Sequence, residues 1–151
     1  MRALLLAGFA VAASPALASL PPPSDEQLST YVSARAAGTL GDPALAAQLF
    51  ANLAKERPGD LGVKRRGIAG AIAAGDMKLA LELARGIPIA ETPLDLRMLI
   101  VADELRAGRD KRAIEILRSR DGTIDSSFLA PFVEAWALAE RRNPRAIDAL
   151  A

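Results

Sequence analysis

The stretch GDPALAAQLF, residues 41–50, predicts a turn followed by the start of a helix with an apolar face. Gly41 suits the position just past a preceding helix, because the backbone there usually takes a positive φ that glycine adopts without strain. Asp42 can accept a hydrogen bond from the first turn of the next helix, and Pro43 fits that turn because no N–H is needed there. This stretch therefore joins two helices.

The same phrase returns three more times along the chain. Its copies are GDMKLALELA at 75–84, GRDKRAIEIL at 108–117 and RRNPRAIDAL at 141–150, the last without its glycine. By subtraction, the matched alanines lie 34, 33 and 33 residues apart: Ala46, Ala80, Ala113 and Ala146. A nearly constant period of this length is typical of arrays of helical repeats.

The rest of the sequence also favours an all-α fold. No segment shows sustained alternation of polar and β-branched residues, so no sheet is expected. Ser24 and Gln27 have the spacing of a capping box at the start of the first helix. The short turns predict antiparallel neighbours. We expect four helix pairs, the last incomplete, at residues 24–59, 60–91, 92–122 and 123–151.

These repeats resemble the tetratricopeptide repeat. The first copy places the glycine, small alanine, large apolar residue and closing proline of that family at Gly41, Ala46, Phe50 and Pro58. The later copies keep part of the pattern, at Gly75, Ala80, Gly108, Ala113, Leu117 and Ala146. The resemblance implies an α-solenoid with a right-handed superhelical twist. Its concave face would be lined mainly by the first helix of each pair and would bind a protein or peptide.

The composition excludes several kinds of catalytic and metal site. The 151 residues include no cysteine and no histidine. Their absence removes thiolate nucleophiles, disulfides, and the commonest general base and zinc ligand. The sequence also lacks a glycine-rich phosphate-binding loop. We therefore predict a protein that is not an enzyme and has no cofactor and no metal site.

Residues 1–18 have the features of a bacterial signal peptide. Arg2 precedes an apolar run at residues 3–13, and residues 16–18 (ALA) have the form of a cleavage site. The run is too short for a permanent membrane span, and residues 19–23 form a proline-rich leader. Loss of Arg2 from 19 basic residues leaves 18, equal to the 18 acidic residues. We expect a periplasmic or secreted protein with no integral membrane span after cleavage and no affinity for nucleic acid.

Five arginines on the expected first helices are candidates for binding a partner on the concave face: Arg35, Arg65, Arg66, Arg97 and Arg106. Together with the adjacent Lys64, they would attract an acidic peptide. The asparagines with which some tetratricopeptide repeats clamp a terminal carboxylate are missing here. Ala69, one turn after Arg65, has no hydrogen-bonding side chain.

Three other groups of residues suggest structural roles. Asp103 and Glu104 are neighbours on one helix, so their side chains diverge by about 100° and are not expected to meet at one site. Ser126 lacks a histidine or lysine to activate it and is expected to cap a helix. The late aromatic residues are expected to pack in the core between units: Phe128, Phe132 and Trp136.

The sequence therefore predicts a non-catalytic scaffold for protein interactions in a bacterial periplasm or envelope. The alternative is the helical region of an envelope enzyme, for instance one that acts on cell-wall glycan, with its catalytic domain beyond Ala151. Ile147 and Leu150 leave the final segment apolar. We expect either further repeats or another chain, through self-association, to cover that end.

The signal-peptide hypothesis predicts a single cleavage after Ala18. Expressed in a bacterial host, the mature protein should begin at Ser19, as N-terminal sequencing or intact mass would show. Replacing Ala16 and Ala18 with bulky leucines should block cleavage, because the peptidase accepts small residues at these positions. A mature protein that retains Met1 would refute the hypothesis.

Overall fold

A computed structural model of the chain describes residues 20–119 and 125–150, and all regular secondary structure in that part of the protein is helical, with no strand. The predicted signal peptide lies outside the described residues. The α-helices are α1 (Asp25–Thr39), α2 (Pro43–Glu56), α3 (Leu61–Ala73), α4 (Met77–Arg85), α5 (Leu94–Arg106), α6 (Asp110–Arg118) and α7 (Ala130–Glu140). Short 3₁₀ helices are η1 (Ile89–Glu91), η2 (Ser127–Leu129), η3 (Pro144–Ala146) and η4 (Asp148–Leu150).

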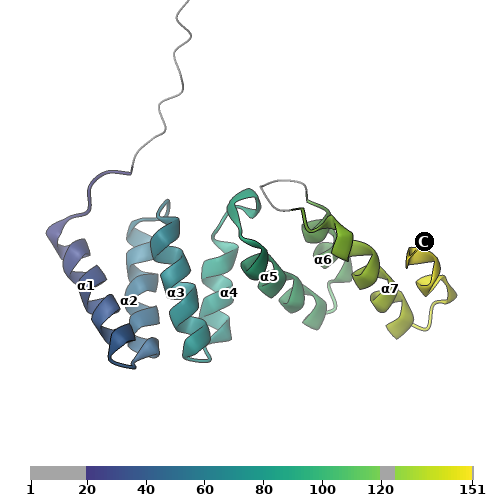
Figure 1. Ribbon diagram of the computed structural model, residues 1–151, viewed down its shortest axis with the longest axis horizontal. Helices are drawn as coiled ribbons and strands as arrows, with labels where there is room; N and C mark the ends of the chain where they lie inside the picture. The colour runs from purple at the N-terminus through teal and green to yellow at the C-terminus, as the bar shows by residue number, and fades with distance from the viewer. Residues whose placement is uncertain (1–19, 120–124, 151) are drawn as a thin grey trace, which may run out of the picture.

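The α-helices stand in an elongated row in chain order, each packed against the next (Figure 1). The first helices of the expected units, α3, α5 and α7, lie nearer the viewer in Figure 1 than α2, α4 and α6. Among consecutive α-helices, α4 and α5 share the smallest packing contact. The described N-terminal and C-terminal ends of the chain lie at opposite ends of the row.

One turn recurs between the first and second helix of every unit. Gly41, Gly75 and Gly108 take positive φ values of 85°, 75° and 70°. At the fourth turn this conformation is adopted by Arg142, with φ of 52°. A residue with a β-carbon is strained there, and glycine is not. The repeat that the sequence shows is thus a repeat of backbone conformation.

The turn is closed by the same backbone hydrogen bond each time. The N–H of the residue after the turn residue donates to the carbonyl five positions earlier, as in a Schellman motif. These bonds join Asp42 to Ala37, Asp76 to Ala71, Arg109 to Glu104 and Asn143 to Leu138, at 2.9, 2.8, 2.8 and 2.9 Å. Each bond satisfies a carbonyl that the end of the first helix would otherwise leave unpaired.

This backbone repeat corrects the alignment of the fourth copy. The sequence match pairs Ala146 with the buried alanines of the first three units. Counting from the positive-φ residue instead pairs Ile147 with them, because Arg142 and not Arg141 occupies the glycine position. Ile147 is exposed and Ala146 is half-buried. The expected last helix is also replaced by the two 3₁₀ turns η3 and η4.

Most helix starts follow from local sequence. The capping box at Ser24 and Gln27 is present, with both hydrogen bonds 3.2 Å long. Aspartate side chains cap the next three helices, and each accepts from the N–H three positions on at 3.0 Å: Asp42, Asp60 and Asp76. These short-range hydrogen bonds each stabilise a helix by about 1 kcal/mol.

The core is built from small and aliphatic residues at repeated positions. Ala46, Ala80 and Ala113 are buried, as are Phe50 and Leu117 of the resemblance pattern. Seven positions before each turn residue, another buried residue recurs: Ala34, Ile68, Val101 and Ala135. Alanine at these positions lets helices approach closely, and the larger neighbours fill the space beside it. Pro58, by contrast, is exposed in the turn before α3.

The turns predict opposite effects for one substitution at two glycines. Gly75→Ala should lower the free energy of unfolding by about 1–2 kcal/mol, because positive φ strains a residue with a β-carbon. Gly38→Ala should raise it by about 0.5–1 kcal/mol, because Gly38 lies within α1 and its new methyl would meet only Ala46 Cβ, at 3.7 Å. Arg142→Gly should relieve strain and also stabilise. Urea titration measures the free energy of unfolding of all three variants. An increase for Gly75→Ala would contradict the assignment of a positive-φ turn at Gly75.

Candidate partner-binding face

Two of the basic residues predicted on the binding surface are buried instead. Lys64 is 9% exposed, and Arg97 is 1% exposed. Lys64 Nζ donates to the carbonyl of Gly86, at the end of α4, over 2.6 Å. Arg97 Nη1 donates to the carbonyl of Ser119, at the end of α6, over 3.4 Å. The prediction that Arg97 contacts a partner is therefore wrong.

The two buried cations are equivalent in the repeat. Lys64 and Arg97 are 33 residues apart, and so are the two carbonyls that accept from them. Cations near the C-terminal end of a helix bond its free carbonyls and interact favourably with its dipole. Arg97 also donates to Ile89 O at 2.9 Å and to Ser126 Oγ at 3.3 Å. In units two and three, a cation of the first helix thus caps the short second helix.

The other four predicted arginines are exposed. Arg35, Arg65 and Arg66 lie on α1 and α3, and Arg106 lies at the end of α5. Arg66 stacks over the ring of Tyr31, with its guanidinium carbon 5.5 Å from the ring centre, and so links α3 to α1. Within the described part of the chain, no carboxylate forms an ion pair with any of the three arginines on α1 and α3.

Comparison of the units identifies the side of the first helices that stays open to solvent. The residue six positions before each turn residue is exposed in all four units: Arg35, Ala69, Ala102 and Trp136. Neighbouring helices therefore leave this position uncovered even inside the row. We call the surface around these four residues the open face. It includes the exposed Arg65 and Arg66, one turn away on α3.

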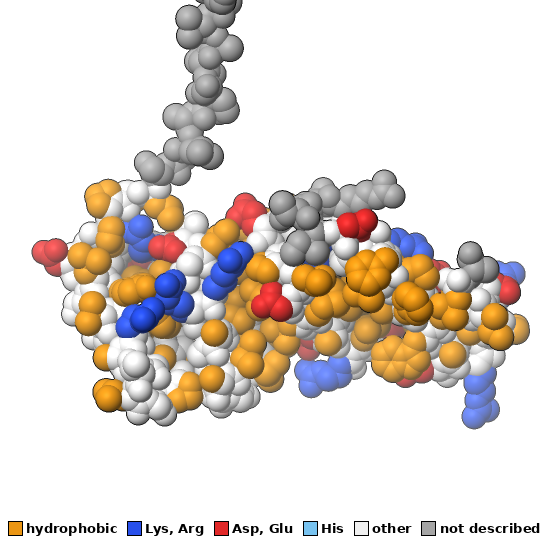
Figure 2. Space-filling model, viewed as in Figure 1, with side chains coloured by type: hydrophobic (Ala, Val, Ile, Leu, Met, Phe, Trp, Pro, Cys, Tyr) orange, Lys and Arg blue, Asp and Glu red, His pale blue; other side chains and the backbone are white. Residues whose placement is uncertain are grey.

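The late aromatic residues are not in the core, contrary to the sequence prediction. Phe128, Phe132 and Trp136 are 61%, 61% and 56% exposed. They are spaced four residues apart from η2 into α7, so they form one stripe along the helix. Figure 2 shows apolar side chains gathered in a band over α5–α7, and basic side chains over the N-terminal helices. An exposed apolar area of this kind marks an interaction surface in many proteins.

The stripe covers two different surfaces. The position of Phe128 is half-buried in the first three units, at Gln27, Leu61 and Leu94, and exposed only in the fourth, where Phe128 lies in η2. Its exposure therefore reflects the end of the described row. The position of Trp136 is exposed in every unit, so the indole belongs to the open face. The sequence alone does not reveal this, because its match of the fourth unit is one residue out of register and the exposure of each position comes from the structure.

Two grooves lie between first helices. One, of about 530 Å³, separates α5 from α7 and is lined by Ala102, Leu105, Arg106, Asp110, Trp136, Ala137 and Glu140. The other, of about 310 Å³, lies between α1 and α3, where Tyr31, Leu53 and Val63 meet Arg57 and Arg66. Both volumes are in the range of ligand sites in proteins, and both grooves are open to solvent.

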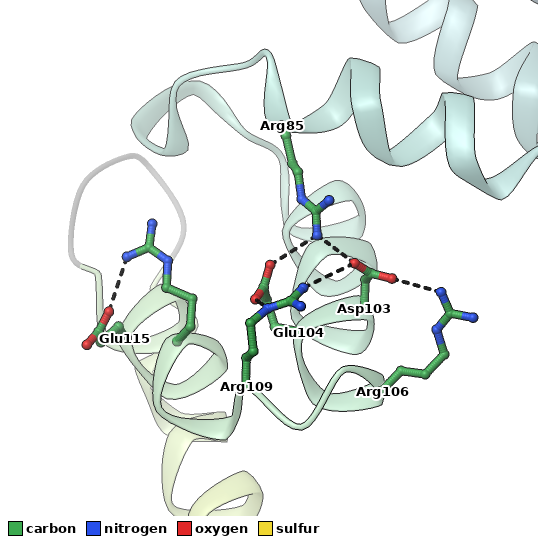
Figure 3. Close-up of polar contacts among 7 residues, drawn as sticks. Arg85, Asp103, Glu104, Arg106, Arg109 and Glu115 are labelled. Atoms are coloured by element: carbon green, nitrogen blue, oxygen red, sulfur yellow. Dashed lines mark hydrogen bonds and ion pairs between the residues drawn. The ribbon is translucent and has the colours of Figure 1, made fainter.

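Asp103 and Glu104 share two arginine partners, because the long side chains of Arg85 and Arg109 reach both carboxylates (Figure 3). Arg85 of α4 lies 2.5 Å from Asp103 Oδ2 and 3.1 Å from Glu104 Oε1. Arg109 Nε donates to Glu104 Oε2 at 2.5 Å, and Arg106 pairs with Asp103 at 3.1 Å. The two pairs of Arg85 bridge α4 and α5, the two consecutive helices that share the smallest contact, and the pair of Arg109 joins α5 to the start of α6.

The arginines hold both carboxylates in the charged form. The hydrogen bond from Arg106, and then that from Arg85, lowers the pKa of Asp103. The hydrogen bond from Arg109, and then the influence of Arg85, lowers the pKa of Glu104 below its usual 4.5, although burial opposes the change. A general acid would need a raised pKa. This cluster is therefore suited to holding two helices together and not to acid–base chemistry.

The described residues include neither a metal-binding cluster nor an accessible Ser126. Residues 20–119 and 125–150 contain no cluster of acidic side chains able to hold a metal ion. Ser126 is fully buried, donates to Leu117 O at 3.1 Å and accepts from Arg97, so it neither caps α7 nor faces solvent. The exposed arginines and aromatic residues are the remaining candidates for function.

Among the described helices, none is long and apolar enough to cross a membrane. No family model, no curated protein and no solved structure matches the chain. The candidate face is thus defined by its own geometry and chemistry: an open side of the first helices, basic over α1 and α3, and aromatic over α7.

The carboxylate cluster predicts acid sensitivity. A carboxylate with a lowered pKa stabilises the fold above its unfolded pKa and loses that effect as pH falls through its folded pKa. The free energy of unfolding should therefore decline from about pH 4.5 downward. Glu104→Gln should cost about 1–3 kcal/mol at pH 7 and flatten this acid-induced decline.

The matched control is Glu115→Gln. Glu115 pairs with Arg112 at 3.1 Å, but both side chains are exposed. An exposed ion pair contributes at most about 1 kcal/mol. Denaturant unfolding at pH 7, 5, 4 and 3 measures all three proteins. If both variants show the same pH profile as the unaltered protein, the cluster does not link the helices as described.

Proposed function

We propose that this protein is a non-catalytic scaffold that binds a protein partner along the open face of its first helices. The observation that carries this proposal is Trp136, a large aromatic residue at a position that every unit leaves exposed. Tryptophan and arginine are the residues most enriched at the energetic centres of protein interfaces. The open face presents both.

In this proposal the helices form antiparallel pairs stacked as an α-solenoid similar to tetratricopeptide repeats. Four observations support it: the 33- to 34-residue period, the repeated positive-φ turn, the repeated 6→1 hydrogen bond and the repeated burial pattern. A stacked array presents an extended surface made of equivalent positions from successive units. Such a surface is suited to a partner longer than one helix pair.

The proposal includes export of the protein to the bacterial periplasm or envelope. Its support is the sequence pattern of residues 1–18, which consists of a positive charge, an apolar run and a small-x-small site. A secreted chain without cysteine needs no disulfide formation to fold, and the helix caps and alanine-rich core supply its stability instead. A partner would then be a protein of the same compartment.

The exposed arginines on α3 provide the test. Reversing both charges, with Arg65→Glu and Arg66→Glu together, should weaken capture of an envelope partner by about tenfold, because unlike charges across an interface become like charges. Capture by the unaltered protein should also decrease with added salt. The measurement is cross-linked affinity capture from envelope extracts, with quantitative mass spectrometry.

Lys78→Glu is the matched control. Lys78 is exposed, but it lies on α4, a second helix, away from the open face. Its reversal changes net charge in the same direction and should leave capture unchanged. Equal losses for both changes would indicate nonspecific attraction. No loss for the double reversal would remove the open face as the binding surface.

A further inference from the structure

The groove between α5 and α7 has a chemistry of its own within the open face. Its floor is apolar: Ala102 and Leu105 come from α5, and Trp136 and Ala137 come from α7. The two alanines leave space beside the indole. At the open-face position the other units carry arginine or alanine, so an aromatic group occurs in only one of the four described units.

Three charged residues line the groove. Glu140 is exposed and has no ion pair among the described residues, and the other two are paired within the protein. Arg106 pairs with Asp103 at 3.1 Å, and Asp110 forms an ion pair with Arg141. A ligand that relied on these charges would have to compete with existing partners. Apart from Glu140, the unsatisfied feature of the groove is its apolar surface, above all the indole, which is 56% exposed. Burying that surface is the main free-energy gain the groove offers.

The charged residues of the open face outside the groove indicate the charge of the ligand that would bind there. Arg35, Arg65 and Arg66 are exposed on the same open face and have no ion pair within the described residues. Charge complementarity therefore favours acidic side chains along the N-terminal part of the face. The groove is open to solvent and includes Ala102 and Trp136 of the open face, which suits a chain segment and not an enclosed small molecule.

We propose that the α5–α7 groove binds a large apolar side chain of an acidic peptide segment, with Trp136 as the principal contact. This inference rests on the proposed function, since it names the chemistry of the partner that the scaffold holds. The apolar anchor gives affinity at α7, and the acidic residues meet the arginines on α1 and α3. Recognition thus has two parts at opposite ends of the open face.

The test uses a random peptide library displayed on phage and selected on the full chain. Enriched peptides should combine leucine, phenylalanine or tryptophan with aspartate and glutamate. Trp136 is the only tryptophan in the chain, so its fluorescence reports occupation of the groove directly. A synthetic copy of an enriched peptide should shift the emission of Trp136 in a saturable way. If that peptide itself contains tryptophan, phenylalanine replaces it in the synthetic copy.

Two variants separate the groove from its surroundings. Trp136→Ala should weaken peptide binding at least about tenfold, measured by calorimetry, as expected for an aromatic residue at the centre of an interface. Phe128→Ala is the matched control, because Phe128 is equally exposed but lies on the end of the row. It should leave binding unchanged. Circular dichroism confirms that both variants fold, which is expected because both side chains are exposed.

Several results would overturn the inference. Selected peptides rich in lysine and arginine would refute the charge assignment, and an absence of enriched peptides would refute the site. Binding that depends on Arg65 and Arg66 but not on Trp136 would leave the scaffold function intact and remove the groove. Concentration-dependent dimerisation, seen by sedimentation, that shields Trp136 would assign the groove to a second copy of the chain.

Discussion

The left-handed turn with its 6→1 hydrogen bond is the constraint on which the rest of the structure depends. It ends each first helix and sets the direction in which the second helix leaves. Because the same geometry recurs at Gly41, Gly75, Gly108 and Arg142, equivalent residues of successive units fall in equivalent surroundings. On each first helix, the position seven residues before the turn is buried and the position six residues before it is exposed. Both regularities follow from this repeated turn. A surface feature such as Trp136 can therefore be interpreted by comparing units.

The buried cations follow from the lengths of the second helices. Helices α4 and α6 have 9 residues each, whereas α2 has 14. A short second helix ends beside the body of the first helix, at the level of Lys64 in unit two and Arg97 in unit three. Lys64 and Arg97 supply the donors that the carbonyls at the ends of α4 and α6 need. In unit one the equivalent residue is Thr30, and the longer α2 continues beyond that level. A buried basic residue at this position thus accompanies a short second helix in units two and three.

The parts of this structure that the sequence predicts well are those set by neighbours along the chain. The glycine turns, the aspartate caps at Asp42, Asp60 and Asp76, and the helical class all depend on contacts within a few residues. The parts that it predicts poorly depend on contacts across units. The sequence does not distinguish Arg97 from Arg65 as a basic residue on a first helix, because the burial of Arg97 depends on contacts with Ile89, Ser119 and Ser126, outside its own helix. Asp103 and Glu104 diverge as helix neighbours, yet arginines from α4 and from the start of α6 reach both carboxylates.

The aromatic residues show why exposure has to be interpreted with the repeat in view. Phe128, Phe132 and Trp136 share chemistry, spacing and nearly the same exposure, so neither composition nor accessibility distinguishes them. The exposure of the equivalent positions in the other units does distinguish them. If the equivalent residues of other units are half-buried, the position is one that neighbouring helices partly cover. If the equivalent residues are exposed, the position faces solvent in every unit. The first condition describes Phe128 and the second describes Trp136. An indole at a position that packing never covers cannot be explained by the stability of the fold, which is the physical reason for assigning it to recognition.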